Sequence, residues 1–440
     1  MARRGTERLG GGDSADLEAA ADRLAAALAD LQGAEAVARE RLRLPSGKGN
    51  FADGHAERRP RATSILAFTV LCLTAERGKN LLNHPDVHLP WSQWSEDQTL
   101  HVATAYSNPF RWRTRRELAN DFRRHMTSTS NVALHVGELA YGARPHEIVG
   151  GYPGDVPLRT QAELFHKENI LNAVIRTFPS DWKYGAWVDA DFHFTRHDWA
   201  LEAIHQLQLY DFVQLFSSYA DMSGETLGSG HLPLRVTPSF AFNYVQNGYN
   251  LPDGFINGGW RSATTAAAPD EYYGGVQAIG PGARRGVGAT GGAWAFRRSA
   301  FDAVGGMLDK CILGHGDWFM TFGLVGEEAP DMHIDGYTPD YRNAILSWQR
   351  NAARLKKNIG YVDGFAVHHW HGSKMRRGYA SRDTILVKYK FAPSDDLKAD
   401  WQGIWQLNND KPALRDAIRQ YFISRNEDDP NCYGSERPMV

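Results

Sequence analysis

The chain has 440 residues, with 49 lysines and arginines against 51 acidic residues, and 42% of it is apolar. These values are typical of a globular protein with a sizeable core, and the formal charge of −2 argues against a protein that coats nucleic acid by bulk charge. The three cysteines, Cys72, Cys311 and Cys432, are too widely spaced for a disulfide-stapled scaffold, and they fit a reducing, cytoplasmic location. The most apolar run, 65–73, is far shorter than the roughly 20 residues of a membrane span, so no membrane partner is expected.

The pattern of residues divides the chain into three parts. Residues 1–61 contain a Gly-rich tail, an Ala-rich helix expected at 14–43 and a linker. Residues 62–395 alternate strands with helices, and residues 396–440 are expected to form a helical extension. Such alternation predicts an α/β fold, in which helices cover both faces of a mainly parallel sheet. The ligand site of such a sheet lies at the carboxyl ends of its strands.

The elements follow in chain order. Strand signals lie at 100–108, 131–139, 184–194 and 211–218. Capping-box patterns predict helices that begin at Thr114-x-x-Glu117, Thr160-x-x-Glu163, Thr195-x-x-Asp198 and Ser299-x-x-Asp302. Residues 222–290 are poor in periodic signal and rich in Gly, Pro, Asn and Tyr, so a functional loop region is expected there.

Two carboxylates, Asp189 and Asp191, come directly after an apolar strand. In an extended chain, residues i and i+2 point to one side, so both carboxylates are expected to converge at the strand's carboxyl end. Hard oxygen ligands at that place suit Mg²⁺ or Mn²⁺, and the ion would in turn hold a diphosphate. The alternative is a solvated turn with two acidic residues.

Two glycine-rich turns follow. The first, at 286–294, ends in Trp294, whose flat face suits a sugar or base; a tight turn with a core tryptophan is the alternative. In the second, Gly314-His315-Gly316 leads into Asp317. A carboxylate aimed into a cleft from such a turn is a candidate general base, and the alternative is an ordinary helix N-cap.

Three histidines, His368, His369 and His371, lie within four residues. Imidazoles at this density suggest metal binding, and the absence of a matching cysteine set argues against structural zinc. Basic residues that follow and would neutralise phosphates are Lys374, Arg376 and Arg377. A basic surface loop is the alternative interpretation of this stretch.

The four motifs together resemble those of GT-A fold glycosyltransferases, which use nucleotide-sugar donors. The segments that carry the resemblance are 187–191 (WVDAD), 290–296 (TGGAWAF), 314–318 (GHGDW) and 369–371 (HWH). The resemblance covers roughly residues 98–390, and phage-encoded glycosyltransferases are the most similar members. Leu313 departs from the pattern, because the family often has Trp there.

The resemblance implies a metal centre and a base. Asp191 would be the main ligand of a divalent ion, with Asp189 nearer the donor ribose or joined to the ion through water. A C-terminal histidine completes the metal shell in the family; His369 and His371 are the candidates, and His371 is preferred. Asp317 would be the general base, which makes inversion at the anomeric carbon the simpler outcome.

The same resemblance places four residues at the nucleotide. Asn108 would receive the nucleotide, and Glu138 would meet its base or ribose. Lys167 and Asn169 resemble the pair that the family places near the nucleobase.

Six further residues are expected around the sugar and the diphosphate. Gly291 and Gly292 belong to the loop that binds the acceptor sugar in the family, and Trp294 is the candidate sugar platform. Lys374 and the Arg376–Arg377 pair would close over the diphosphate.

The function expected from these features is metal-dependent sugar transfer from a nucleotide-sugar, most simply a UDP-sugar, with Mn²⁺ or Mg²⁺. A nucleotidyltransferase on a similar sheet is an alternative, although Asn108-Pro109 stands where its phosphate loop belongs. A non-catalytic sugar-binding module is another, against which the intact acidic and histidine motifs count.

The acceptor is expected to be a hydroxymethylated base in phage DNA, or alternatively a virion protein or a glycan. Residues 110–124 hold six arginines with Phe110 and Trp112, a pattern that suits a nucleic-acid backbone. The alternative, which is slightly favoured, is that these arginines form the solvated face of a helix.

Overall fold

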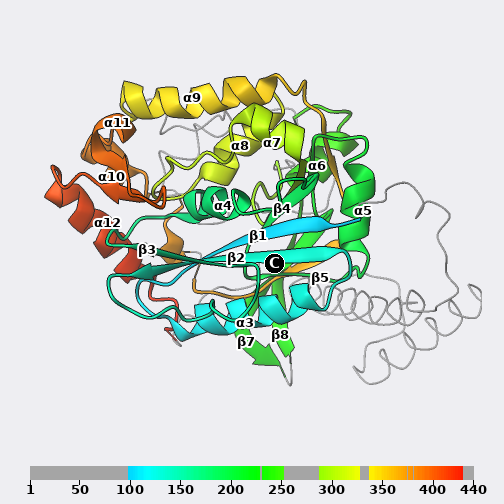
Figure 1. The fold of residues 1–440 in the computed structure, drawn as a ribbon, viewed down its shortest axis with the longest axis horizontal. Coiled ribbons are helices and arrows are strands. Elements are labelled where there is room, and N and C mark those ends of the chain that lie inside the picture. Colours follow the sequence, from blue (N-terminus) through cyan, green and yellow to red (C-terminus); the bar gives the residue numbers. More distant parts are fainter. Residues whose placement is uncertain are drawn as a thin grey trace, which may run out of the picture. The chain divides into compact units, whose positions relative to one another are not determined.

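A seven-stranded sheet forms the centre of the structure, with the strand order β10-β6-β9-β4-β1-β2-β3 (Figure 1). The computed structural model describes residues 98–227, 230–251, 287–327, 336–373, 375–379 and 381–429, so the expected helix at 14–43 lies outside the described residues. The strands of this sheet are β1 (Leu100–Ser107), β2 (Val132–Tyr141), β3 (Asp155–Thr160), β4 (Tyr184–Val188), β6 (Phe212–Gln214), β9 (Ala293–Arg297) and β10 (Ile359–Tyr361). Neighbouring strands run parallel, except that β9 is antiparallel to β4 and β6.

Helices cover both faces of this sheet. On one face, α3 (Arg113–Thr127) and α5 (Trp199–Gln206) bury Phe122 and Trp199 against β1. On the other face, α4 (Lys167–Ile175), α8 (Gly316–Leu324) and α9 (Pro339–Ala353) join a core that includes Trp187 and Trp294. The α/β class with a mainly parallel, helix-flanked sheet, expected from the sequence, is confirmed.

The remaining described helices are short, apart from the last. They are α6 (Phe240–Gln246), α7 (Arg298–Val304), η3 (Met375–Arg377), α10 (Thr384–Lys388), α11 (Pro393–Asp396) and α12 (Pro412–Arg425), and a two-stranded unit, β12 (Leu397–Ala399) with β13 (Trp405–Leu407), precedes α12. Among the helices that the structure describes, none combines the length and the apolar character that crossing a membrane requires.

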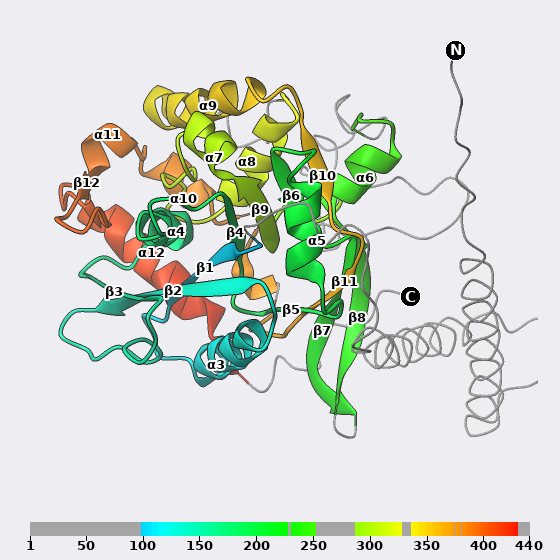
Figure 2. The same ribbon diagram turned by 45° about the vertical axis from the view of Figure 1, so that its right-hand side comes forward.

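A second sheet, with the order β5-β11-β7-β8, lies beside the central one (Figure 2). Its strands are β5 (Phe192–Phe194), β7 (Ser218–Leu227), β8 (Gly230–Pro238) and β11 (Phe365–His368). Each of three strands of the central sheet, β4, β6 and β10, is followed within a few residues by a strand of the second sheet. The single strands expected at 184–194 and 211–218 are therefore wrong, because each of these segments leaves one sheet and enters the other.

None of the four expected capping boxes opens its helix: α5 begins only at Trp199, after Thr195, and α7 begins at Arg298, before Ser299. Thr160 ends β3 instead of opening a helix; its hydroxyl accepts the amide of Ala162, and α4 begins only at Lys167. Thr114 lies inside the first turn of α3, and its hydroxyl donates to Asp428 Oδ1 at 2.7 Å instead of capping the helix. Both of these hydroxyls donate to a residue distant in sequence, that of Thr114 to Asp428 and that of Thr160 to Gln406 Oε1 at 3.0 Å.

The region 222–290, expected to be irregular, is regular in part. Residues up to Leu227 continue β7, and β8 and α6 follow before the described chain stops at Leu251. The β7–β8 pairing has register shifts near Met222, which interrupt the alternation that a sequence pattern would reveal.

Helix α4 lies close over β2 because Gly137 has no side chain. A Cβ atom on Gly137 would lie 2.6 Å from Ile170 Cγ2 and closer still to Val174 Cγ2. Both contacts are with branched core side chains of α4 that are almost completely buried. This close approach fixes the helix whose first residues, Lys167 and Glu168, reach the site described below.

The Gly137→Ala variant is expected to lower the free energy of unfolding by about 1–3 kcal/mol, because the added methyl group overpacks the α4–β2 contact. Urea denaturation, followed by tryptophan fluorescence, measures the change. Gly151→Ala is the control, because a Cβ atom there meets nothing within 4 Å. Equal unfolding midpoints for the two variants would contradict the close packing.

Candidate functional site

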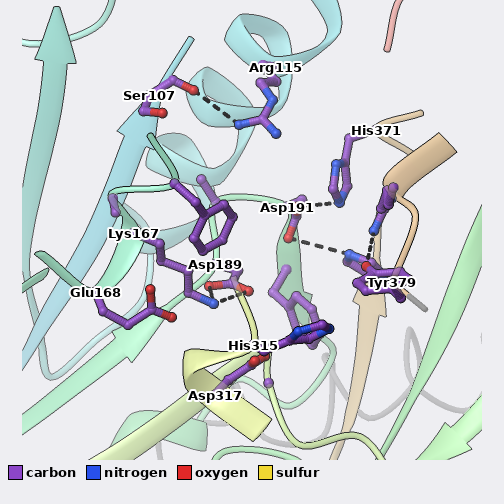
Figure 3. Close-up of a pocket in the computed structure, with 18 of the residues that line it drawn as sticks. Ser107, Arg115, Lys167, Glu168, Asp189, Asp191, His315, Asp317, His371 and Tyr379 are labelled. Carbon is purple, nitrogen blue, oxygen red and sulfur yellow. Dashed lines mark hydrogen bonds and ion pairs between the residues drawn. The ribbon is translucent and has the colours of Figure 1, made fainter. Parts of the chain in front are cut away.

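One pocket, about 320 Å³ in volume, lies where strands of the two sheets meet. Its walls come from the end of β1, the start of α4, the residues after β4, the glycine-rich segment before β9, the start of α8 and the segment after β11. In the view of Figure 3, Asp189 and Asp191 lie between Arg115 on one side and His315 with Asp317 on the other. The carboxyl ends of β1 and β4 thus carry the site, as expected for a parallel sheet.

A carboxylate and two imidazoles converge in this pocket. His371 Nε2 lies 2.9 Å from Asp191 Oδ2, and His368 Nε2 lies 3.7 Å from Asp191 Oδ1. The three residues offer ligand atoms that lie within 4.8 Å of one another. Asp191 Oδ1 is buried without a hydrogen-bond partner, so it has a lone pair for a cation. Two imidazoles and one carboxylate fit a divalent first-row transition metal better than Mg²⁺, which prefers oxygen ligands.

A further carboxylate orients one of the imidazoles. His368 Nδ1 lies 2.6 Å from Asp221 Oδ1, and Arg235 Nε donates to Asp221 Oδ2 at 2.6 Å. Such outer partners fix the ring of a metal-binding histidine. Burial lowers the pKa of His368, but the carboxylates of Asp191 and Asp221 outweigh it and raise this pKa to about 9. Burial and the charge of Arg377 lower the pKa of His371 to about 4, so only one of the two imidazoles carries a proton near neutral pH.

His369, the other expected ligand, does not reach the pocket. Its Nε2 lies 3.1 Å from His193 Nδ1, while its backbone amide donates to the carbonyl of Asp191 at 2.9 Å. The chain leaves the strand after His368, so simple alternation of side chains stops there. The structure therefore brings His368 and His371, and not His369, to Asp191.

Asp189 faces a lysine instead of joining the three metal-ligand candidates. Its carboxylate lies 2.6 and 2.8 Å from Lys167 Nζ. Residues 189–192 form a turn, in which the Phe192 amide donates to the Asp189 carbonyl, so the two carboxylates do not converge on one point as an extended chain would allow. Burial would lower the pKa of Lys167, but Asp189 and Asp317 hold it above its usual value, so the ammonium group stays charged.

A basic wall completes the pocket. Its arginines are Arg115, Arg377, Arg382 and Arg425. Glu427 accepts from two of them, with N–O distances of 2.5 Å to Arg115 and 2.7 Å to Arg425. Burial raises the pKa of Glu427, but these arginines outweigh burial and hold it at about 2.

Arg377 carries a charge that no carboxylate of the described chain pairs with directly. Its guanidinium donates to the Gly372 carbonyl at 3.2 Å and to the Tyr379 hydroxyl at 3.1 Å, and the residue is 6% exposed. A buried guanidinium without an ionic partner is suited to an anionic ligand. The wall as a whole therefore suits a diphosphate.

Two more acidic groups, Asp317 and Glu168, lie at the start of α8 and α4. A Cβ atom on Gly291 would clash with the Asp317 carboxylate, so the glycine-rich loop needs a glycine at that place. Asp317 Oδ1 accepts the amide of Trp318 at 2.9 Å. Burial raises the pKa of Glu168 to about 8, despite the opposing charge of Lys167. Glu168 is thus neutral near pH 7 and can donate a hydrogen bond.

Several expected site residues have structural roles. Asn108 closes the turn after β1 by donating to the Trp112 carbonyl and accepting the Trp112 amide, both at 2.9 Å. Glu138 accepts the backbone amides of 147–149, so its carboxylate holds the loop after β2. Asn169 binds the backbone of Gly403 and Trp405. None of these three side chains lines the pocket.

Trp294 is completely buried and stacks against Trp187 with ring centroids 6.3 Å apart, so it belongs to the core and cannot serve as a sugar platform. Trp318 and Trp112 line the pocket instead. Gly292 has a φ of +91° and packs against Phe192, and it lines the pocket with Gly291.

Of the two arginines expected at the diphosphate, Arg377 lines the pocket, whereas Arg376 pairs with Asp429 at 2.8 Å outside it. Lys374 lies outside the described residues.

No protein-family model and no curated protein matches the chain. Among solved structures, one match is the catalytic domain of Drosophila β1,4-galactosyltransferase 7 in complex with xylobiose. The match covers 72% of this chain and 98% of that chain, with 11% sequence identity and a TM-score of 0.29. A match of this similarity does not indicate an activity for this chain.

Glu168 makes stability depend on pH. In the folded metal-free protein its pKa is about 8, against an ordinary 4.5, so unfolding releases a proton between these values and the free energy of unfolding falls as pH rises. The Glu168→Gln substitution introduces a neutral side chain with the same shape as protonated Glu168. Its free energy of unfolding relative to the wild type is expected to rise from pH 5 to pH 8, by at most about 1.4 kcal/mol per pH unit.

Urea denaturation at both pH values measures this difference. Glu117→Gln, at an exposed position of α3, is the matched control and should show no such trend. A constant difference between Glu168→Gln and the wild type would show that Glu168 is ionised throughout.

Proposed function

We propose that the protein is a metal-dependent glycosyltransferase, which moves a sugar from a nucleoside-diphosphate donor to an acceptor hydroxyl. The observation that carries the proposal is the pairing, in one pocket, of the Asp191–His368–His371 cluster with a wall of four buried or half-buried arginines. The cluster suits a divalent metal, and the wall suits the diphosphate that the metal would bind. The motif resemblance described from the sequence agrees with this chemistry.

Asp191, His368 and His371 would hold a divalent ion such as Mn²⁺, which would supply Lewis acidity toward the diphosphate leaving group. Asp221 keeps the His368 ring in place. Arg377 and Arg115 face the donor phosphates and stabilise the negative charge that grows on them as the glycosidic bond breaks. Lys167 holds Asp189 beside the site, where its carboxylate is available to the donor ribose.

For the acceptor we propose a hydroxyl group, which belongs to a hydroxymethylated DNA base, a protein or a glycan. The arginine run at 110–124 supports DNA only in part. Arg113 and Arg124 are exposed but pair with acidic residues of α3 itself, while Arg115 pairs with Glu427 and Arg123 pairs with Asp155 at 2.8 Å. Because its charges are neutralised in this way, the run is a weaker track for a phosphate backbone than its sequence indicates.

The same two-histidine, one-carboxylate set also binds iron in mononuclear oxygenases. The basic wall distinguishes the two possibilities, because an oxygenase substrate needs no diphosphate site. A screen of UDP- and GDP-sugars with Mn²⁺, Mg²⁺ and Fe²⁺, read as nucleotide release with and without acceptors, tests the proposal directly. If no combination of donor and metal gave nucleotide release, the proposed function would be overturned.

Asp191→Asn is expected to reduce Mn²⁺-dependent nucleotide release by about 100-fold or more, because the cluster loses its only anionic ligand. Mn²⁺ titration calorimetry should show the matching loss of binding. Asp198→Asn, at a carboxylate that pairs with Arg196 away from the pocket, is the control. Full activity of Asp191→Asn, or of the wild type in EDTA, would contradict the metal role.

Arg377→Met is expected to raise the donor KM by about 10- to 100-fold, since a charge-assisted hydrogen bond to a phosphate is worth roughly 1.5–3 kcal/mol. Arg376→Met, one residue away but paired with Asp429 outside the pocket, is the matched control. Steady-state kinetics with the best donor of the screen separates the two. A larger effect of Arg376→Met would contradict the role of Arg377 as the phosphate ligand.

A further inference from the structure

His315 has a backbone conformation that few residues other than glycine adopt. It lies between Gly314 and Gly316, immediately before α8, with a φ of +71°. The left-handed region costs a residue with a Cβ atom about 1–2 kcal/mol. Strain of this kind persists where the surrounding structure imposes it, often at functional sites. Here it sets a histidine, 8% exposed, into the wall of the pocket.

The two nitrogens of the His315 ring have different environments. Nδ1 lies 2.7 Å from Asp383 Oδ2, and the Tyr337 hydroxyl donates to the same oxygen. A neutral ring therefore keeps its proton on Nδ1, where the carboxylate accepts it, and leaves a lone pair on Nε2. Nε2 is buried and has no hydrogen-bond partner, although the residue lines a pocket built for a ligand. An imidazole fixed by a carboxylate, with its other nitrogen free, is the arrangement of a general base.

We propose that His315 takes the proton of the acceptor hydroxyl through Nε2, with Asp383 and Tyr337 as positioning residues. This inference rests on the proposed glycosyl transfer. The acceptor oxygen forms a bond to the anomeric carbon as the bond from that carbon to the diphosphate oxygen breaks, and the electron pair leaves with the diphosphate. The acceptor proton moves to Nε2, and the imidazolium later loses it to water. A single displacement of this kind inverts the anomeric centre.

Asp317, the base expected from the sequence, is less suited to this step. One oxygen accepts the Trp318 amide, and the carboxylate packs against Gly291 close to the Lys167–Asp189 pair. A carboxylate held in this way is suited to accept a hydrogen bond from a second, non-reacting hydroxyl group of the acceptor molecule. Asp317 therefore orients the acceptor, and His315 deprotonates it.

Charged groups around His315 come from three segments. Asp383 and Arg382 precede α10, and the Arg382 guanidinium lies over Gly314. Asp317 lies on α8, and Glu168 of α4 packs against Gly316. Burial raises the pKa of Asp383, but the charges of His315 and Arg382 outweigh burial and hold it at about 2. Asp383 therefore stays ionised and balances the imidazolium that forms during the step.

Chemical rescue tests the base. His315→Gly suits the left-handed backbone and leaves a space of the size of an imidazole ring. With the nucleotide sugar that the wild type hydrolyses fastest, and water as the acceptor, kcat is expected to fall by about 10²- to 10⁴-fold while the donor KM changes little. Added imidazole should restore much of the rate. Added 1,2,4-triazole, which has the same shape but is a far weaker base, should not.

The positioning role of Asp383 has its own readout. In protein labelled with ¹⁵N-histidine, ring nitrogen shifts should show His315 with the proton on Nδ1, and Asp383→Asn should shift the proton to Nε2 and lower kcat. Asp396→Asn is the control, since Asp396 is also a buried carboxylate, bound to the Ala392 amide and Lys411 at 2.8 Å. It is expected to lose stability but keep the His315 tautomer and kcat.

The outcomes separate the two proposals. A wild-type protein that hydrolyses no nucleotide sugar would overturn the proposed function. An active wild type, with His315→Gly equally active or rescued as well by triazole as by imidazole, would overturn only the base. Loss of activity in Asp317→Asn without loss in His315→Gly would assign the base to Asp317.

Discussion

A single backbone hydrogen bond, from the His369 amide to the Asp191 carbonyl, brings the two halves of the metal cluster together. It extends the antiparallel pairing of β11 with β5, in which His368 faces Phe192. Because the bond fixes this register, the imidazoles of His368 and His371 meet a carboxylate located almost 180 residues earlier in the chain. A slip of one residue would turn His369 toward Asp191 and replace the cluster by another set of side chains.

That register depends in turn on how the chain passes from one sheet to the other. After β4, β6 and β10 the chain leaves the central sheet and enters the second. The Val362 amide donates to the Gln214 carbonyl at 2.8 Å, so the crossing after β10 is bound to the end of β6. In the crossing after β4, the Asp189 amide donates to the Gly292 carbonyl at 2.8 Å, and the side chains of Asp189 and Asp191 line the pocket.

The sequence predicted the parts of this arrangement that depend on local pattern. Apolar strands ending in acidic residues, as at β4, and the strand–helix alternation are visible because burial repeats with a fixed period. Asp191, His371, Asp317 and Lys167 all line the pocket, as the motifs indicated.

The rest depends on tertiary contacts that leave no local signal. The sequence suggests that Trp294 is a ligand platform, but its side chain packs in the core against the sheet. Arg115 and Arg425 lie some 310 positions apart, and only the shared carboxylate of Glu427 reveals that they face one pocket. For His315 the sequence contains one signal, its position between two glycines. This position indicates an unusual backbone conformation, but it does not reveal the partner Asp383.

The pairing of Arg115 with Glu427 has a consequence for biosynthesis. When residue 400 is added to the nascent chain, the central sheet and the metal cluster have been synthesised, yet Arg115 still lacks its carboxylate and Arg425 does not exist. The basic wall of the pocket reaches its final charge only when the residues after α12 have been made and contact α3. The residues of the central sheet are therefore available to fold before the phosphate pocket can be completed.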